Sequence, residues 1–168
     1  MNVKTRNEIL KTGAPVLESG VFSAASQQKH HHCTTVASHS LHVAVTSIFL
    51  CNVLEAAGIP VDRELVVLAA LLHDMGIVGR YQKYANNREC CSRHPSDSAE
   101  IANEFAGDLM SSQTGERAEK LEDAIRRHMW PLNAGIPNSL EAWVLTIADK
   151  QASFAEVLPG RRKKRFAV

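Results

Sequence analysis

The sequence predicts an all-α protein, a single bundle of about five to seven helices. Long segments repeat their apolar residues with the period of a helix, and these segments end at Gly or Pro. No segment alternates convincingly between polar and apolar residues, as a half-buried strand would. The 168 residues suit one domain with a substantial core. We expect that domain over residues 30–158, after an arm or short helix over 1–29 and before a basic tail over 159–168.

The N-terminal part is weakly patterned. A short helix is expected over residues 7–11, ended by Gly13 and Pro15. The small and polar residues 19–28 predict a loop or an arm. Three consecutive histidines, residues 30–32, follow this segment.

Two apolar helices are predicted next. The first, over residues 36–57, contains His39 and His42, and imidazoles in an apolar helix need polar partners. The second, over residues 63–73, is capped by Asp62 and is apolar on nearly all sides. A helix of that kind is buried, so we expect it at the centre of the bundle.

An imidazole and a carboxylate stand side by side at the end of the second helix, in Leu71-Leu72-His73-Asp74-Met75-Gly76. Adjacent side chains on a continuous helix diverge, so both reach one point only near a helix end, or if the carboxylate bridges two centres. Gly76 is expected to supply the backbone freedom for that ending. A buried unpaired carboxylate is costly, which favours a divalent cation beside Asp74.

The second half contains three further predicted helices. Residues 77–93 have the composition of a basic loop, and His94-Pro95 is expected to open a helix because proline suits a first turn. Two more helices are predicted over residues 116–128 and 140–157.

Several imidazoles and carboxylates fall on apolar faces or at helix ends. Apart from one adjacent pair, each comes from a different predicted helix. Four His and two Asp that point into one bundle have the composition of a two-metal site. The set comprises His39, His73, Asp74, His94, His128 and Asp149.

Several short motifs resemble the HD-domain superfamily of metal-dependent phosphohydrolases. The segment His39-Ser40-Leu41-His42-Val43-Ala44 resembles the helix that carries its first ligand, and the register of Val43-Ala44 favours His39 over His42. Leu71–Gly76 is similar to its signature, and Ile147-Ala148-Asp149-Lys150 to its closing segment. The segments around His94 and His128 resemble a bacterial subgroup of small stand-alone HD proteins. The resemblance spans residues 31–157.

The resemblance implies one or two divalent transition-metal ions, with Mn, Fe, Co, Ni and Zn as candidates. The first ion would be held by His39, His73, Asp74 and Asp149, and the second by His94 and His128, with Asp74 as the bridging, catalytic carboxylate. Two ions about 3.5–4 Å apart can generate hydroxide near neutral pH and neutralise a phosphoryl oxygen. The expected activity is hydrolysis of a small, nucleotide-like phosphomonoester or phosphodiester.

Three residues are candidates for binding the substrate. His31 lies eight residues before His39, the offset at which many relatives place a histidine that faces the substrate. Arg80 and Lys150 are basic neighbours of the motifs and could clamp phosphate oxygens. His30 and His32 are expected to be exposed.

Two alternatives to hydrolysis stay open. Some HD relatives with six such ligands bind two irons and activate oxygen to cleave C–C or C–P bonds. A non-catalytic, metal-stabilised HD module with a regulatory role is the other alternative.

Composition bounds the partners and the location. A net charge of +1 gives no strong nucleic-acid signal, and the basic run 161–165 is short. The longest apolar run, residues 43–54, is too short to span a bilayer, and the four cysteines include no Cys-x-x-Cys pair. We therefore expect a cytoplasmic protein that acts on a small molecule, with a homo-oligomer left open.

Overall fold

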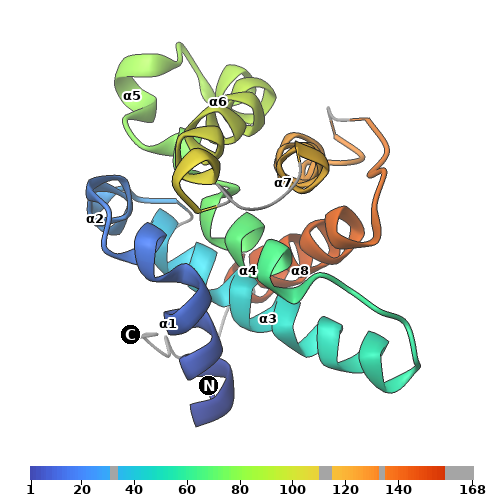
Figure 1. Ribbon diagram of the computed structural model, residues 1–168. Helices are drawn as coiled ribbons and strands as arrows, with labels where there is room; N and C mark the ends of the chain where they lie inside the picture. The colour runs from blue at the N-terminus through green and yellow to red at the C-terminus, as the bar shows by residue number, and fades with distance from the viewer. Residues whose placement is uncertain (31–33, 110–114, 133–134, 158–168) are drawn as a thin grey trace.

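The computed structural model describes the chain except for residues 31–33, 110–114, 133–134 and 158–168, and it gives no side chain for 106–109. Within the described residues the protein forms eight α-helices, one short 3₁₀ turn and no strand (Figure 1). The all-α prediction is therefore confirmed. The elements are α1 (Val3–Leu17), α2 (Gly20–Gln27), α3 (Val36–Ala56), α4 (Arg63–Leu72), η1 (Met75–Ile77), α5 (Arg80–Lys83), α6 (Asn87–Leu109), α7 (Gly115–Arg127) and α8 (Leu140–Val157).

Helix α4 occupies the middle of the bundle and packs against α1, α3, α6, α7 and α8 (Figure 1). Every residue of α4 from Leu65 to Leu72 is buried, as its all-round apolar pattern predicts. Asp62 caps the helix, because its carboxylate accepts a hydrogen bond from the main-chain N–H of Leu65 at 3.0 Å. This helix carries the His-Asp pair into the centre of the molecule.

Helix α3 is longer than the apolar run recognised in the sequence. Its 21 residues are long and apolar enough to cross a membrane, judged by length and composition alone. More than half of its most apolar 18-residue window is buried within the fold, and the helix packs against α4 and α8. This burial is typical of the core helix of a folded domain.

The prediction for the N-terminal part is wrong in two places. Helix α1 runs through Gly13 and Pro15, and residues 20–27 form helix α2 rather than a loop. Gly13 marks a close approach to α4, since a Cβ there would lie 2.3 Å from a Leu71 methyl carbon. Helix α2 is stabilised by burial of Phe22. The small and polar residues around Phe22 gave the segment the composition of a loop.

The start of α6 also differs from the prediction. Residues 80–83 form the short helix α5, and α6 begins at Asn87, so Pro95 lies inside a helix rather than in its first turn. Asn86 explains the earlier start, because its side-chain oxygen accepts from the N–H of Glu89 at 2.9 Å, as a helix cap does. The helix therefore begins at this cap and continues through Pro95, which the sequence analysis placed in the first turn.

Gly76 is needed for space rather than for an unusual backbone angle. A Cβ at this position would lie 2.5 Å from the carbonyl oxygen of His94 and 2.8 Å from the nitrogen of Ser98. The Gly76 N–H donates to the Ser98 hydroxyl at 2.9 Å. Among the described residues, the positive φ angles of glycine occur instead at Gly58 and Gly79. The turn after α4 can therefore pack directly on the α6 backbone.

The last two helices agree closely with the prediction. Helix α7 ends at Arg127, which leaves His128 just beyond its C-terminus, and α8 has the predicted bounds. The Ser139 hydroxyl accepts from the N–H of Ala142 at 3.1 Å and caps α8.

Candidate metal centre

The structure brings all six predicted metal ligands into one buried cluster. They come from five different helices or helix ends, which meet around the C-terminus of α4. Each side chain is at least nine-tenths buried. The cluster comprises His39 of α3, His73 and Asp74 at the end of α4, His94 of α6, His128 after α7 and Asp149 of α8.

Asp74 lies at the centre of the cluster because the chain leaves the helix there. His73 still has helical backbone angles, whereas Asp74 has φ −111° and ψ 7°. The two adjacent side chains can therefore both point inward, which a continuous helix would prevent.

The two oxygens of Asp74 face different imidazoles. Its Oδ2 lies 3.4 Å from Nε2 of His73 and 3.7 Å from Nε2 of His39. Its Oδ1 lies 3.2 Å from Nε2 of His94 and 3.5 Å from Nε2 of His128. A carboxylate in this position can bridge two cations.

Asp149 adds a second carboxylate on one side only. Its Oδ1 lies 3.0 Å from Nε2 of His39 and 3.7 Å from Nε2 of His73. We call the group of His39, His73, Asp149 and Asp74 Oδ2 the Asp149 side. We call the group of His94, His128 and Asp74 Oδ1 the His94 side.

Main-chain carbonyl groups place a proton on Nδ1 of three of the imidazoles. Each Nδ1–H donates to a carbonyl oxygen in the preceding helical turn, and a carbonyl can only accept. The inward Nε2 of a neutral imidazole is then a free lone pair, the form that binds a metal. These bonds join His73 to Ala70 at 2.9 Å, His94 to Cys90 at 2.8 Å and His128 to Ile125 at 2.6 Å.

The inward nitrogens fit bound cations. The Nε2 atoms of His94 and His128 lie 3.1 Å apart, so two lone pairs face one another unless a proton or a cation lies between them. Within the described part of the chain, the buried Nε2 of His73 has no hydrogen-bond partner. A divalent ion on each side would satisfy these atoms with the nitrogen and oxygen ligands that transition metals accept.

The carboxylates of the cluster stay ionised although they are buried. Burial raises the pKa of Asp74, but the imidazoles of His73 and His30 outweigh it and hold that pKa well below its usual range. Burial likewise raises the pKa of Asp149, and His39 and His73 reverse the effect. Two negative charges in the protein interior need positive partners.

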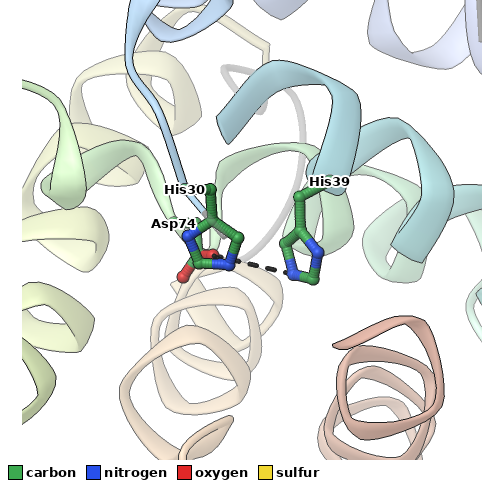
Figure 2. Close-up of side chains that lie close together, drawn as sticks. All are labelled: His30, His39 and Asp74. Carbon is green, nitrogen blue, oxygen red and sulfur yellow. Dashed lines mark ion pairs between the residues drawn. The ribbon is translucent and has the colours of Figure 1, made fainter. Parts of the chain in front are cut away.

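His30 is a seventh member of the cluster, and the prediction that it is exposed is wrong. Its side chain is 11% exposed, and its Nε2 lies 3.4 Å from Asp74 Oδ2. Figure 2 shows the imidazoles of His30 and His39 beside Asp74. The centroids of these two rings lie 4.4 Å apart. An antiparallel bridge between Lys29 and Thr35 places His30 next to the start of α3. The signal in the sequence was the run of three histidines. His31 lies outside the described residues.

The structure brings only one of the two basic candidates to the cluster. Nζ of Lys150 donates to Asp149 Oδ2 at 2.7 Å and to the carbonyl oxygen of His128 at 3.0 Å, and its side chain is 39% exposed. Arg80 instead donates to Asn87, and its guanidinium lies 5.5 Å from the centre of the Tyr81 ring.

His42, the competitor of His39, faces a carboxylate that the sequence analysis missed. Its Nδ1 lies 3.1 Å from Glu156 Oε1, while Nδ1 of His39 lies 3.1 Å from Glu156 Oε2. Glu156 follows Asp149 by seven residues, two turns of α8. That spacing on one helix face was the available signal.

The sequence profile of the HD domain matches residues 36–152, well over half of the chain. The chain belongs to the HD-domain family. The matched region contains all six predicted ligands of the cluster, whereas His30 and Glu156 lie outside it. No curated protein and no solved structure shows significant similarity to this HD-domain chain.

Proposed function

We propose that this HD-domain protein is a metal-dependent phosphohydrolase that cleaves a small, nucleotide-like phosphomonoester or phosphodiester. The observation that carries the proposal is the position of Asp74, whose two oxygens face separate groups of buried imidazoles. The family supports this assignment, since HD domains are typically metal-dependent phosphohydrolases.

The residues of the chain divide the work. When bound, two divalent ions supply a hydroxide near neutral pH and neutralise charge on a phosphoryl oxygen. Asp74 and Asp149 would hold them, together with the imidazoles whose tautomers the carbonyl groups fix. The partly exposed ammonium of Lys150, beside Asp149, is placed to bind a phosphate oxygen of the substrate.

The test begins with the metal content of protein purified without chelator. The protein is then screened under anaerobic conditions with Mn, Fe, Co, Ni and Zn against p-nitrophenyl phosphate, bis-p-nitrophenyl phosphate and a panel of nucleotides. We expect close to two ions per chain and turnover of at least one ester. A single ion would remove the dinuclear part and keep the hydrolase assignment.

A second candidate is an HD-type di-iron oxygenase, favoured by the convergence of both His94 and His128 on Asp74. Oxygen consumption by the iron-loaded protein, with no ester turnover under any metal, would support it. Bound metal without either activity would indicate a regulatory module and contradict both enzymatic proposals.

A further inference from the structure

The outer partner of His39 differs in kind from the outer partners of the other predicted ligands. The imidazoles of His73, His94 and His128 donate to neutral main-chain carbonyl groups. His39 instead directs its Nδ1 at a carboxylate, Glu156 Oε2, at 3.1 Å, while its Nε2 points into the cluster. The outer partner of His39 is therefore anionic, whereas the outer partners of the other three imidazoles are neutral.

Glu156 is itself held in place from the side opposite its own helix. Oε1 lies 3.1 Å from Nδ1 of His42, and Oε2 accepts a hydrogen bond from the Thr34 hydroxyl at 3.2 Å. The carboxylate side chain is 8% exposed. Two imidazole nitrogens and one hydroxyl group surround this carboxylate, and these donors favour its ionised form. One fixed negative charge thus joins α8 to α3 and to the segment before it.

An anionic acceptor behind a histidine ligand changes the ligand. It fixes the tautomer and the ring orientation, and it makes the inward nitrogen more basic. With Glu156 included, the Asp149 side has two carboxylates of its own besides the shared Asp74. Among the described residues, the His94 side has only the shared carboxylate. Lys150 beside Asp149 offsets one negative charge of the Asp149 side, which still has the larger negative charge. The two sides therefore attract a divalent ion unequally.

We infer that Glu156 is a positioning residue that orients His39 and makes the Asp149 side the tighter of two metal positions. That side then fills first, and the His94 side fills at a higher metal concentration. The inference rests on the metal centre of the proposed function and is independent of the reaction catalysed there.

The experiment is a titration of the metal-free, full-length protein with Mn²⁺ by calorimetry, with a competing chelator for the tighter step. We expect two steps of unequal affinity in the wild type. Glu156→Ala should weaken the tighter step about 10- to 100-fold, the usual effect of removing an outer partner, and leave the weaker step nearly unchanged. Glu156→Gln keeps an acceptor oxygen, so the affinity of its tighter step should lie between those of the wild type and Glu156→Ala.

The control is Glu119→Gln, which removes a charge from an exposed position on α7 and should leave both steps unchanged. The Co²⁺ absorption spectrum gives a second readout, since reorientation of His39 alters the ligand field even if Glu156→Ala lowers the stability. Wild-type affinity and an unaltered spectrum in Glu156→Ala, with two ions still bound, would overturn this inference alone. Absence of bound metal in the wild type would overturn it together with the proposed function.

Discussion

The two sides of Asp74 use the same imidazole nitrogen and are built differently around it. On the Asp149 side, carboxylates lie both inside the cluster and behind it. On the His94 side, imidazoles supported by carbonyl groups meet the one shared carboxylate. Counting ligands alone gives the Asp149 side four and the His94 side three, a difference of one. The larger difference is the number of negative charges, whose attraction for a cation is strong in a buried site.

The largest expected effect comes from Asp74→Asn, which removes the charge that both sides share. We expect bound metal to fall below one ion per chain and ester hydrolysis to fall by at least about 10²- to 10³-fold. Metal analysis and turnover of the best ester measure this. If the variant retained two ions, the bridging position of Asp74 would be refuted.

The next effect separates the sides directly. His39→Ala should abolish the tighter binding step, whereas His94→Ala should keep one ion per chain and lose the second. Both changes remove one buried imidazole, so each serves as the control for the other. Equal losses in the two variants would show that the sides are equivalent.

Lys150→Met tests the proposed contact between the Lys150 ammonium and a phosphate oxygen of the substrate. The substitution keeps the aliphatic stem and removes the ammonium that donates to Asp149 and to the His128 carbonyl group. We expect KM to rise about 10- to 100-fold, since a hydrogen bond to a charged group contributes about 1.5–3 kcal/mol. Lys120→Met, in an exposed pair with Glu116, is the matched control and should leave KM unchanged.

The smallest effect is the pH dependence of the metal-free protein, in which His128 and His39 act in opposite directions. Burial lowers the pKa of His128 from 6.5 to about 4, although the hydrogen bond to Asp74 acts to raise it. The stability that it contributes is present above pH 6.5 and is lost as the pH falls towards 4. Burial also opposes the charge on His39, but Asp149 and Glu156 raise its pKa to about 10. Its contribution is complete below pH 6.5 and is lost as the pH rises towards 10.

Urea unfolding of chelator-treated protein between pH 4 and pH 10 measures both trends. His128→Gln should flatten the acid limb, and His39→Gln should flatten the alkaline limb. Identical profiles in the two variants would contradict the assignment of charges.

The sequence predicted that the central side chains converge in the core, because each combines two signals. His73 and Asp74 end a helix whose apolar pattern already requires burial, and Asp149 lies on the core face of the last helix. A polar group at a position that must be buried needs a partner, and that requirement is visible in the sequence.

The misses concern weak local signals and contacts between segments that are distant in the sequence. Glu156 is one of 18 acidic residues, and its value depends on α3 lying beside α8. His30 enters the cluster through a bridge between Lys29 and Thr35, which the surrounding sequence does not announce. The start of α6 differs from the prediction because the cap at Asn86 starts the helix before Pro95, which the prediction took as the helix start.

The hydrogen atom that serves as the side chain of Gly76 has a further consequence. It lets the turn after α4 touch the α6 backbone at His94, so a single added methyl group would push that helix outward. Gly76→Ala would then carry the imidazole of His94 away from Asp74 while leaving every ligand chemically intact. The separation of the two proposed metal positions is thus adjustable at a residue that belongs to neither of them.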